Sequence, residues 1–80
     1  MEIAVKYFGI IADITQKKEE VFVMTDEPIM LKKIQSKIEV IYPKLLVINY
    51  SIAVNSKFLQ NDILLKNKDT IAFLPPFAGG

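Results

Sequence analysis

The groups with which this chain could do chemistry are few. The 80-residue sequence contains no histidine and no cysteine. It therefore lacks the usual general base at neutral pH, the strongest side-chain nucleophile and the preferred ligands of zinc, copper and haem. The acidic pairs Glu19-Glu20 and Asp26-Glu27 lie in polar stretches, where positions in turns and at helix starts are the default interpretation. We expect no catalytic site within this chain alone, and no metal or cofactor bound to it.

The C-terminus is the most distinctive chemical feature. Proline lacks an N–H and fixes its φ angle, so Pro75 and Pro76 should end the hydrogen bonding of the last strand and keep the chain extended. The following Ala78, Gly79 and Gly80 carry almost no side chain and could enter a channel too narrow for most residues. Five extended residues reach roughly 17 Å at about 3.4 Å each. The sequence thus predicts a slim tail that delivers a carboxylate into a partner's active site.

Length and charge narrow the class of protein further. Eighty residues, 51% of them hydrophobic, are enough for one small domain. The net charge is only +1, and the ten basic residues are all lysines spread from Lys6 to Lys68. Nucleic-acid binders usually show a clustered basic face rich in arginine. Neither a secretory start nor a membrane-spanning run is present, so we expect a cytoplasmic protein without nucleic-acid or membrane partners.

Alternating side chains predict a first strand at residues 2–8. Its core face would carry Ile3, Val5 and Tyr7, which leaves Phe8 on the exposed side. The next predicted elements are one or two helical turns at 9–15, a turn at 16–20 and a strand at 21–24. This second strand should pair with the first in a hairpin-like arrangement.

One main helix is expected in the middle of the chain. The residues Thr25-Asp26-Glu27-Pro28 are typical of a helix start, with side-chain oxygens for capping and a proline for the first turn. An apolar stripe then follows at Leu31, Ile34, Ile38 and Ile41. Because Pro43 disfavours helical geometry in the preceding residue, the helix should end near Tyr42.

The last part of the chain predicts further strands. In chain order these are a strand or packed loop at 45–48, a strand at 51–54, a short strand or bridge at 58–59 and a closing strand at 70–74. Strands around one helix indicate an α+β fold with a mixed sheet of four to five strands and the main helix on one face. The predicted organisation is a single domain at residues 1–76 and a flexible tail at 77–80.

Three segments carry a resemblance to a known family. They are Val5-Lys6-Tyr7-Phe8-Gly9, Ala53-Val54-Asn55 and the C-terminal run from Ala72 to Gly80. With the element order, they make the chain similar over its whole length to the ubiquitin-like β-grasp sulfur carriers. Within that group it most resembles the small subunit of molybdopterin synthase. A Gly-Gly pair at the extreme C-terminus after Pro-Pro is a specific signal, whereas the Ala-Val-Asn triplet is useful only for register.

The sequence departs from the family pattern in two turns. The turn before the last strand usually carries Asp-Gly-Asp and here reads Asn67-Lys68-Asp69. The glycine often found after the first short helix is absent from Thr15-Gln16-Lys17. Other residues can substitute in turns, so these departures concern loop shape more than function.

The resemblance implies a chemical role for the last two residues, Gly79 and Gly80. A free carboxylate is ionised at neutral pH and is a poor electrophile. In this family an adenylyltransferase related to ubiquitin-activating enzymes, which uses ATP and Mg²⁺, converts it into an acyl-adenylate. Sulfur from a persulfide protein then displaces AMP and leaves a thiocarboxylate on Gly80. The carrier next docks on the large synthase subunit and donates sulfur to cyclic pyranopterin monophosphate.

The resemblance also implies a partner-binding surface. Neighbouring first and last strands would place outward-facing Phe8 and Leu74 side by side, and Phe58 matches the third member of the family's hydrophobic patch. For Phe58, ordinary core filling is an equally good interpretation. The remaining partner-binding residues would be those of the tail: Pro75, Pro76, Phe77 and Ala78.

Several other functions remain open at the level of sequence. A sulfur carrier for thiamine thiazole synthesis shares the fold and the Gly-Gly, but usually lacks Pro-Pro. Carriers for tRNA thiolation or cysteine synthesis are further alternatives. A ubiquitin-like modifier would join Gly80 to lysines through isopeptide bonds. In the simplest alternative, a β-grasp interaction domain has an incidental Gly-Gly.

Overall fold

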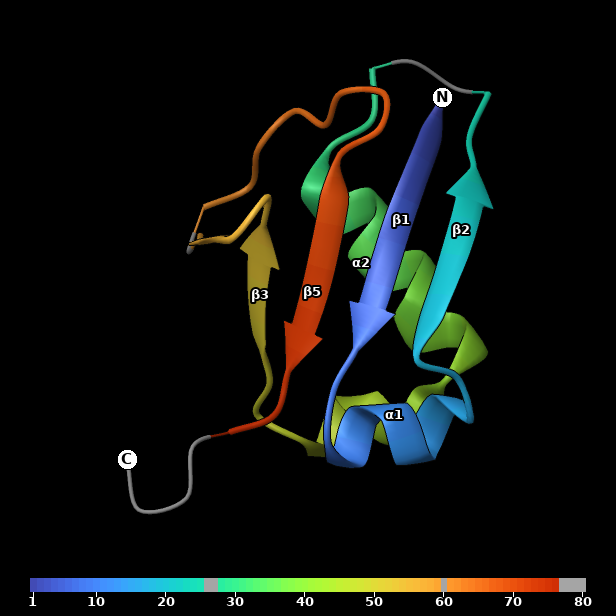
Figure 1. The fold of residues 1–80 in the computed structure, drawn as a ribbon, viewed down its shortest axis with the longest axis vertical. Helices are drawn as coiled ribbons and strands as arrows, with labels where there is room; N and C mark the ends of the chain where they lie inside the picture. The colour runs from blue at the N-terminus through green and yellow to red at the C-terminus, as the bar shows by residue number, and fades with distance from the viewer. Residues whose placement is uncertain (26–27, 60, 77–80) are drawn as a thin grey trace.

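One mixed β-sheet and the helix α2 behind it form the body of the protein (Figure 1). The computed structural model describes residues 1–25, 28–59 and 61–76. In chain order the elements are β1 (Glu2–Tyr7), α1 (Ile10–Thr15), β2 (Glu19–Val23), α2 (Leu31–Ile41), the 3-10 helix η1 (Pro43–Val47), β3 (Ser51–Val54), β4 (Lys57–Phe58) and β5 (Thr70–Leu74). This confirms the predicted α+β architecture.

The first and last strands lie side by side in the middle of the sheet. The strand order is β2-β1-β5-β3-β4. β1 pairs antiparallel with β2, as the hairpin-like prediction required, and parallel with β5. The parallel register runs from Ala4 opposite Thr70 to Tyr7 opposite Phe73. β3 is antiparallel to both β5 and the two-residue strand β4. The C-terminal tail therefore leaves from a central strand, at the end where β1 leads into α1 (Figure 1).

The core lies between one sheet face and α2. The predicted core face of β1 is confirmed, since Ile3, Val5 and Tyr7 are buried. Burying one such aliphatic side chain contributes about 1.5–3 kcal/mol. Other strands and helices supply the rest of the core, including Ile71, Phe73, Ile52, Val54, Phe22, Met24, Leu31, Ile34, Ile38, Ile11 and Leu45. The opposite sheet face, which we call the outer face, is free of α2.

The predicted start of the main helix was wrong. α2 begins at Leu31, and its N-cap residue Met30 provides no side-chain hydrogen bond. The reason is tertiary: the backbone just before α2 bonds to a distant segment, through Leu31 N–H to the Ile63 carbonyl at 2.8 Å and a bridge between Met30 and Leu64. Asp26 and Glu27 of the expected start signature lie outside the described residues.

The apolar stripe of α2 ends one turn earlier than predicted. Leu31, Ile34 and Ile38 are buried, but Ile41 is 48% exposed. The helix ends at Ile41, as Pro43 predicted. Tyr42, four residues after Ile38, packs against the core in place of Ile41 and contacts Tyr7 edge to face at 6.1 Å between ring centroids.

Two local predictions also change. Glu19 and Glu20 were expected in a turn, yet both belong to β2, where Glu20 pairs with Val5. The Glu20 carboxylate tolerates this position because Tyr7, Tyr42 and Lys17 donate hydrogen bonds to it. Residues 45–48 are neither strand nor simple loop, because η1 covers Pro43–Val47 and buries Leu45.

Both departures from the family pattern fall at left-handed backbone positions. Gln16 has a φ of 60° at the C-cap of α1, and Lys68 has a φ of 74° in the turn before β5. Glycine adopts such angles without steric cost, whereas other L-residues do so with strain. The turns therefore keep the backbone shape that glycine favours although the residues differ.

Candidate functional site

The described part of the tail exit consists of Leu74, Pro75 and Pro76. β5 ends at Leu74, which confirms that the two prolines follow directly after the strand. Leu74 and Pro75 are half-buried, and Pro76 is exposed. The predicted site residues Phe77, Ala78, Gly79 and Gly80 lie outside the described residues.

Two tyrosine rings hold the strand just before this exit. Phe73 is fully buried and lies between Tyr7, edge to face at 5.8 Å, and Tyr50, stacked at 4.9 Å. The Tyr50 hydroxyl accepts a hydrogen bond from Gln35 at 2.8 Å and donates one to Glu39. Such aromatic pairs contribute about 0.5–1.5 kcal/mol each beyond their buried area. The last strand is thus fixed in position up to two residues before Pro75.

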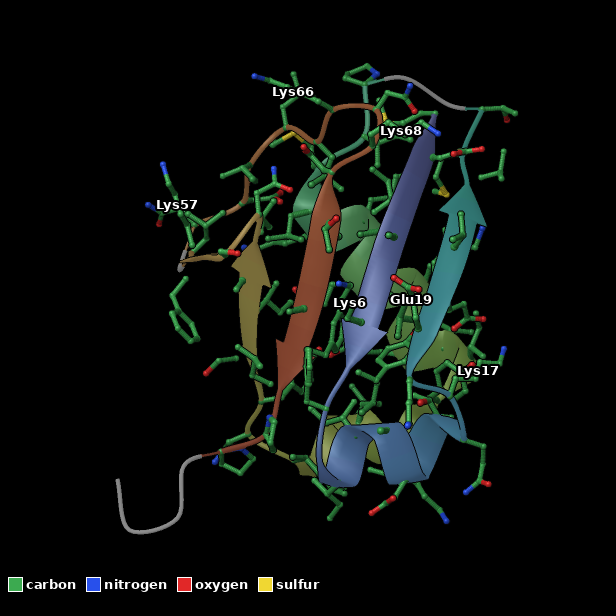
Figure 2. The ribbon with its side chains drawn as sticks, viewed as in Figure 1. Lys6, Lys17, Glu19, Lys57, Lys66 and Lys68 are labelled. Atoms are coloured by element: carbon green, nitrogen blue, oxygen red, sulfur yellow. The ribbon has the colours of Figure 1, made fainter. Side chains whose placement is uncertain are left out.

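The outer face carries a continuous row of side chains across all five strands. Paired residues put Glu19 beside Lys6, Lys6 beside Ala72, Ala72 beside Ala53, and Ala53 beside Phe58. Directly opposite residues in a sheet point to the same face. Figure 2 shows Lys6 and Glu19 on the face turned away from α2. Phe58 is therefore an outer-face residue at one edge of the sheet.

Exposure decides between the two interpretations of Phe58. Its side chain is 60% exposed, so core filling is excluded, and Phe8 is 43% exposed. Continuing the β1–β5 register one residue past Tyr7 and Phe73 brings Phe8 level with Leu74. The three predicted docking residues thus share the outer face, with Phe8 and Leu74 beside the tail exit and Phe58 level with Ala72, although Leu74 is less exposed than the two phenylalanines.

A shallow hollow adjoins these residues on the outer face. Its lining combines apolar and polar side chains: Lys6, Phe8, Asn55, Ser56, Thr70 and Ala72. Sequence reasoning missed its polar members, because they come from three separate segments that only the sheet brings together. It also missed that Val21 and Val23, on the other edge strand, are 57% and 67% exposed.

The Glu20 carboxylate is linked to the strand before the exit through Tyr7, whose ring contacts Phe73. Burial alone would raise its pKa, but hydrogen bonds from Lys17, Tyr7 and Tyr42 outweigh burial and hold the pKa below the ordinary 4.5. The distances from these donors are 2.9, 2.8 and 3.1 Å. Burial, followed by the hydrogen bond to Glu20, raises the pKa of the Tyr7 hydroxyl far above its ordinary value. The Glu20 carboxylate and the Tyr7 hydroxyl therefore stay in one charge state at neutral pH and act as structural ties.

Other kinds of site have little support in the described ranges. No group of three or more Asp and Glu side chains there is placed to hold a metal ion. The lysines labelled in Figure 2 stand apart, with Lys57, Lys66 and Lys68 near the end where β5 begins and Lys17 near the opposite end. None of the helices in this part of the chain has the length and apolar character for crossing a membrane.

A mixed five-stranded sheet with one main helix on one face, ending in a central strand, is the β-grasp fold of ubiquitin-like proteins. The model of the ThiS family matches residues 5–80. The chain belongs to the ThiS family. The resemblance to the β-grasp sulfur-carrier group, inferred from the sequence, is thereby confirmed.

Solved structures agree with this assignment. A protein described as molybdopterin converting factor subunit 1 from Pyrococcus furiosus is 22% identical, with a TM-score of 0.85 over 96% of this chain and 99% of its own. In a complex of subunits 1 and 2 of molybdopterin-converting factor from Helicobacter pylori 26695, the matching chain is 27% identical, with a TM-score of 0.71 and full coverage of both chains. Small archaeal modifier protein 1 from Methanosarcina acetivorans is 21% identical, with a TM-score of 0.78 over 99% of this chain and 96% of its own.

Proposed function

We propose that this protein is the sulfur carrier subunit of a molybdopterin synthase. The observation that carries the proposal is the full-length match, at 27% identity, to a chain in a complex of subunits 1 and 2 of molybdopterin-converting factor. The sequence Pro75-Pro76 before a terminal Gly79-Gly80 supports the same role. Membership of the ThiS family supports the broader class, a carrier rather than a catalyst.

In this proposal the chain contributes one reactive group, the carboxylate of Gly80. An ATP- and Mg²⁺-dependent adenylyltransferase joins that carboxylate to the α-phosphate of ATP, and pyrophosphate leaves. The outer sulfur of a persulfide on a second protein attacks the acyl carbon and displaces AMP, which gives an acyl disulfide. A thiol then cleaves the S–S bond, is itself oxidised to a disulfide with the donor, and leaves a thiocarboxylate on Gly80. Transfer of this sulfur to cyclic pyranopterin monophosphate returns the carboxylate for another cycle, and two transfers complete the dithiolene of molybdopterin.

The other residues in the proposal bring Gly80 to its two partners. Gly79 keeps the end of the tail narrow, and Phe77 and Ala78 line the mouth of the partner's channel. The outer-face residues Phe8, Phe58 and Leu74 dock on the large synthase subunit, since an apolar patch on a small protein usually marks an interface. The working assembly would be a cytoplasmic heterotetramer of two carriers and two large subunits.

Intact mass analysis tests the proposal. The protein is purified after coexpression with its adenylyltransferase and a persulfide donor, and its mass is compared with that of the protein expressed alone. We expect a mass increase equal to exchange of one oxygen for sulfur at Gly80. Adducts linked through lysine would instead support a ubiquitin-like modifier. Formation of molybdopterin upon mixing the thiocarboxylate form with the large subunit distinguishes this carrier from those for thiamine thiazole synthesis or tRNA thiolation.

Deleting Gly80 should abolish sulfur transfer without affecting the fold. The residue follows β5, which ends at Leu74, and as a glycine it has no side chain to bury. The urea unfolding midpoint should therefore equal that of the full chain, while thiocarboxylate formation falls to background. Extending the chain by one alanine is a matched control that keeps Gly79-Gly80 but blocks the carboxylate. If the shortened chain still supports molybdopterin formation, the proposed mechanism is wrong.

A further inference from the structure

The connection between β1 and α1 contacts the tail exit through Gly9. Gly9 has a φ of 56° and a ψ of −133°, a backbone conformation that L-residues with a side chain rarely adopt. A Cβ built on Gly9 would lie 3.0 Å from Cγ, 3.6 Å from Cβ and 3.8 Å from Cδ of Pro75. The pyrrolidine ring thus packs directly on the Gly9 backbone, and a side chain at position 9 would have to displace it by a few tenths of an ångström.

This contact continues the parallel register of β1 and β5 beyond the strands themselves. Tyr7 is paired with Phe73, and the same offset two residues further along matches Gly9 with Pro75. Backbone pairing has ended by then, because β1 stops at Tyr7 and β5 at Leu74. Beyond the last hydrogen bonds between β1 and β5, the Pro75 ring packs against the Gly9 backbone and keeps the two segments in contact.

We propose that Gly9 is a positioning residue for the C-terminal carboxylate. With no side chain at position 9, Pro75 packs against the β1–α1 connection, and Pro75 in turn sets the direction in which Pro76 and the tail leave the sheet. The inference rests on the proposed function, in which one carboxylate must reach the active sites of two partners. A tail whose base already points in one direction loses less conformational freedom upon entering each site.

A purely local role for Gly9 is the competing explanation. The positive φ alone would strain any L-residue at this position, whatever surrounds it. Strain in the β1–α1 connection does not depend on Pro75, whereas positioning of the tail acts through it. A double-mutant cycle separates the two effects, because the strain term is the same in both backgrounds and cancels in the coupling.

The experiment measures Gly9→Ala in three backgrounds: wild type, Pro75→Ala and Pro76→Ala. The readouts are kcat and KM for adenylation, followed as pyrophosphate release with the adenylyltransferase and ATP, at a temperature where circular dichroism shows every variant folded. We expect Gly9→Ala to lower kcat by about tenfold with KM little changed, because the docking surface is intact and the reacting carboxylate is displaced. In the Pro75→Ala background the loss of kcat caused by Gly9→Ala should shrink to about twofold. In the Pro76→Ala background, which is the matched control, it should stay near tenfold.

Each possible result has a defined meaning. Equal losses in the Pro75→Ala and wild-type backgrounds would overturn the inference. If Gly9→Ala does not fold, Pro75→Ala alone decides: a lowered kcat supports the inference and an unchanged kcat overturns it. Failure of the proposed function is recognised separately. A protein that is not activated at its C-terminus would release no pyrophosphate, and a carrier or modifier of another pathway would release it but yield no molybdopterin with the large subunit.

Discussion

At the scale of single residues, Glu20 connects more of the structure than any neighbour on its strand. Its carboxylate accepts hydrogen bonds from Tyr7 on β1, from Tyr42 at the end of α2 and from Lys17 before β2. Tyr7 in turn contacts Phe73 at the end of β5. Through Tyr7, the Glu20 carboxylate therefore links β5, the strand that precedes the tail, to the end of α2 and to the segment before β2.

Replacing Glu20 with glutamine should destabilise the protein in a pH-dependent way. Hydrogen bonds to a charged acceptor contribute about 1.5–3 kcal/mol, and solvent near this partly exposed group reduces that value, so we expect a loss of about 1–2 kcal/mol at pH 7. Because the pKa of Glu20 is lower in the folded protein than its ordinary value of 4.5, the unfolded chain binds the proton first as the pH falls. The carboxylate's contribution is complete above pH 4.5 and is lost as the pH falls through the lower folded pKa.

Urea unfolding of wild type and Glu20→Gln at pH 7 and at successively lower pH values measures this difference. The gap between the two free energies of unfolding should narrow below pH 4.5. Glu19→Gln is the matched control, since Glu19 is the preceding residue on the same strand and lies exposed on the outer face. A gap of constant size across this pH range would show that the charge of Glu20 contributes nothing.

A second residue-scale prediction concerns Gln16. Its left-handed φ of 60° costs a non-glycine residue about 1–2 kcal/mol, while glycine loses about 0.5–1 kcal/mol of chain entropy. Gln16→Gly should therefore stabilise the protein by roughly 0.5–1 kcal/mol and raise the thermal midpoint by roughly 2–6 °C. Gln16→Gly and Gln16→Ala both lose the exposed side-chain hydrogen bond to the Asp13 carbonyl, but only Gln16→Ala keeps the backbone strain, so Gln16→Ala should not stabilise. Equal midpoints for the two variants would contradict the strain explanation.

At the scale of elements, the cap of the main helix comes from a distant loop. The backbone N–H of Lys32 in the first turn of α2 donates to Asp62 Oδ1 at 2.8 Å. We expect Asp62→Ala to lower the free energy of unfolding by about 1 kcal/mol, because it removes both an acceptor and a negative charge at the helix N-terminus. Asp62→Asn keeps the acceptor and should lose less. Urea denaturation checks the order wild type, then Asn, then Ala; an Asp62→Ala protein as stable as wild type would rule out this capping role.

The same element shows what sequence patterns can and cannot predict. Alternation identified β1 and β5 almost to the residue, because a strand buried on one face must alternate. Leu31, Ile34 and Ile38 were recognised because their spacing follows one helix face. The start of α2 was not, since its acceptor Asp62 is thirty residues away in sequence. A local capping signature could not compete with hydrogen bonds that exist only after the segments meet.

For the candidate site, the sequence predicted the residue types but not their arrangement. Exposure of Phe8 followed from strand alternation and from the family resemblance, whereas for Phe58 the sequence left core filling equally open and only the structure shows the side chain exposed. The row from Glu19 through Lys6 to Phe58 depends on the register of five strands, which the sequence did not specify. The contact between Gly9 and Pro75 likewise appears only when β1 and β5 are paired.

At the scale of the whole molecule, the outer face has two edges with different surroundings. Phe58 on β4 lies level with Ala72, two residues before the end of β5, whereas Val23 on β2 lies level with Glu2, at the end of the sheet away from the exit. Val23 is the more exposed of the two, at 67% against 60%. Exposed apolar side chains thus occur at both edges, and exposure alone does not select one of them as the interface. Under the proposed function the carrier docks while its terminus enters the partner, so the position of Phe58 nearer to the tail exit along the strands favours the β4 side.

Substitution of these two residues decides which edge is used. Phe58→Ser should weaken binding to the large synthase subunit by about 30-fold, the equivalent of about 2 kcal/mol for a central aromatic contact. Val23→Ser, the matched control at the other edge, should weaken binding by less than about threefold. Titration calorimetry with the unmodified carrier measures both affinities, and urea unfolding checks that the two variants remain comparably stable. If the partner binds the β2 side, Val23→Ser should weaken binding more than Phe58→Ser. Equal effects of the two substitutions would mean that the partner covers the whole outer face. In that case the position of the tail exit does not select the docking edge.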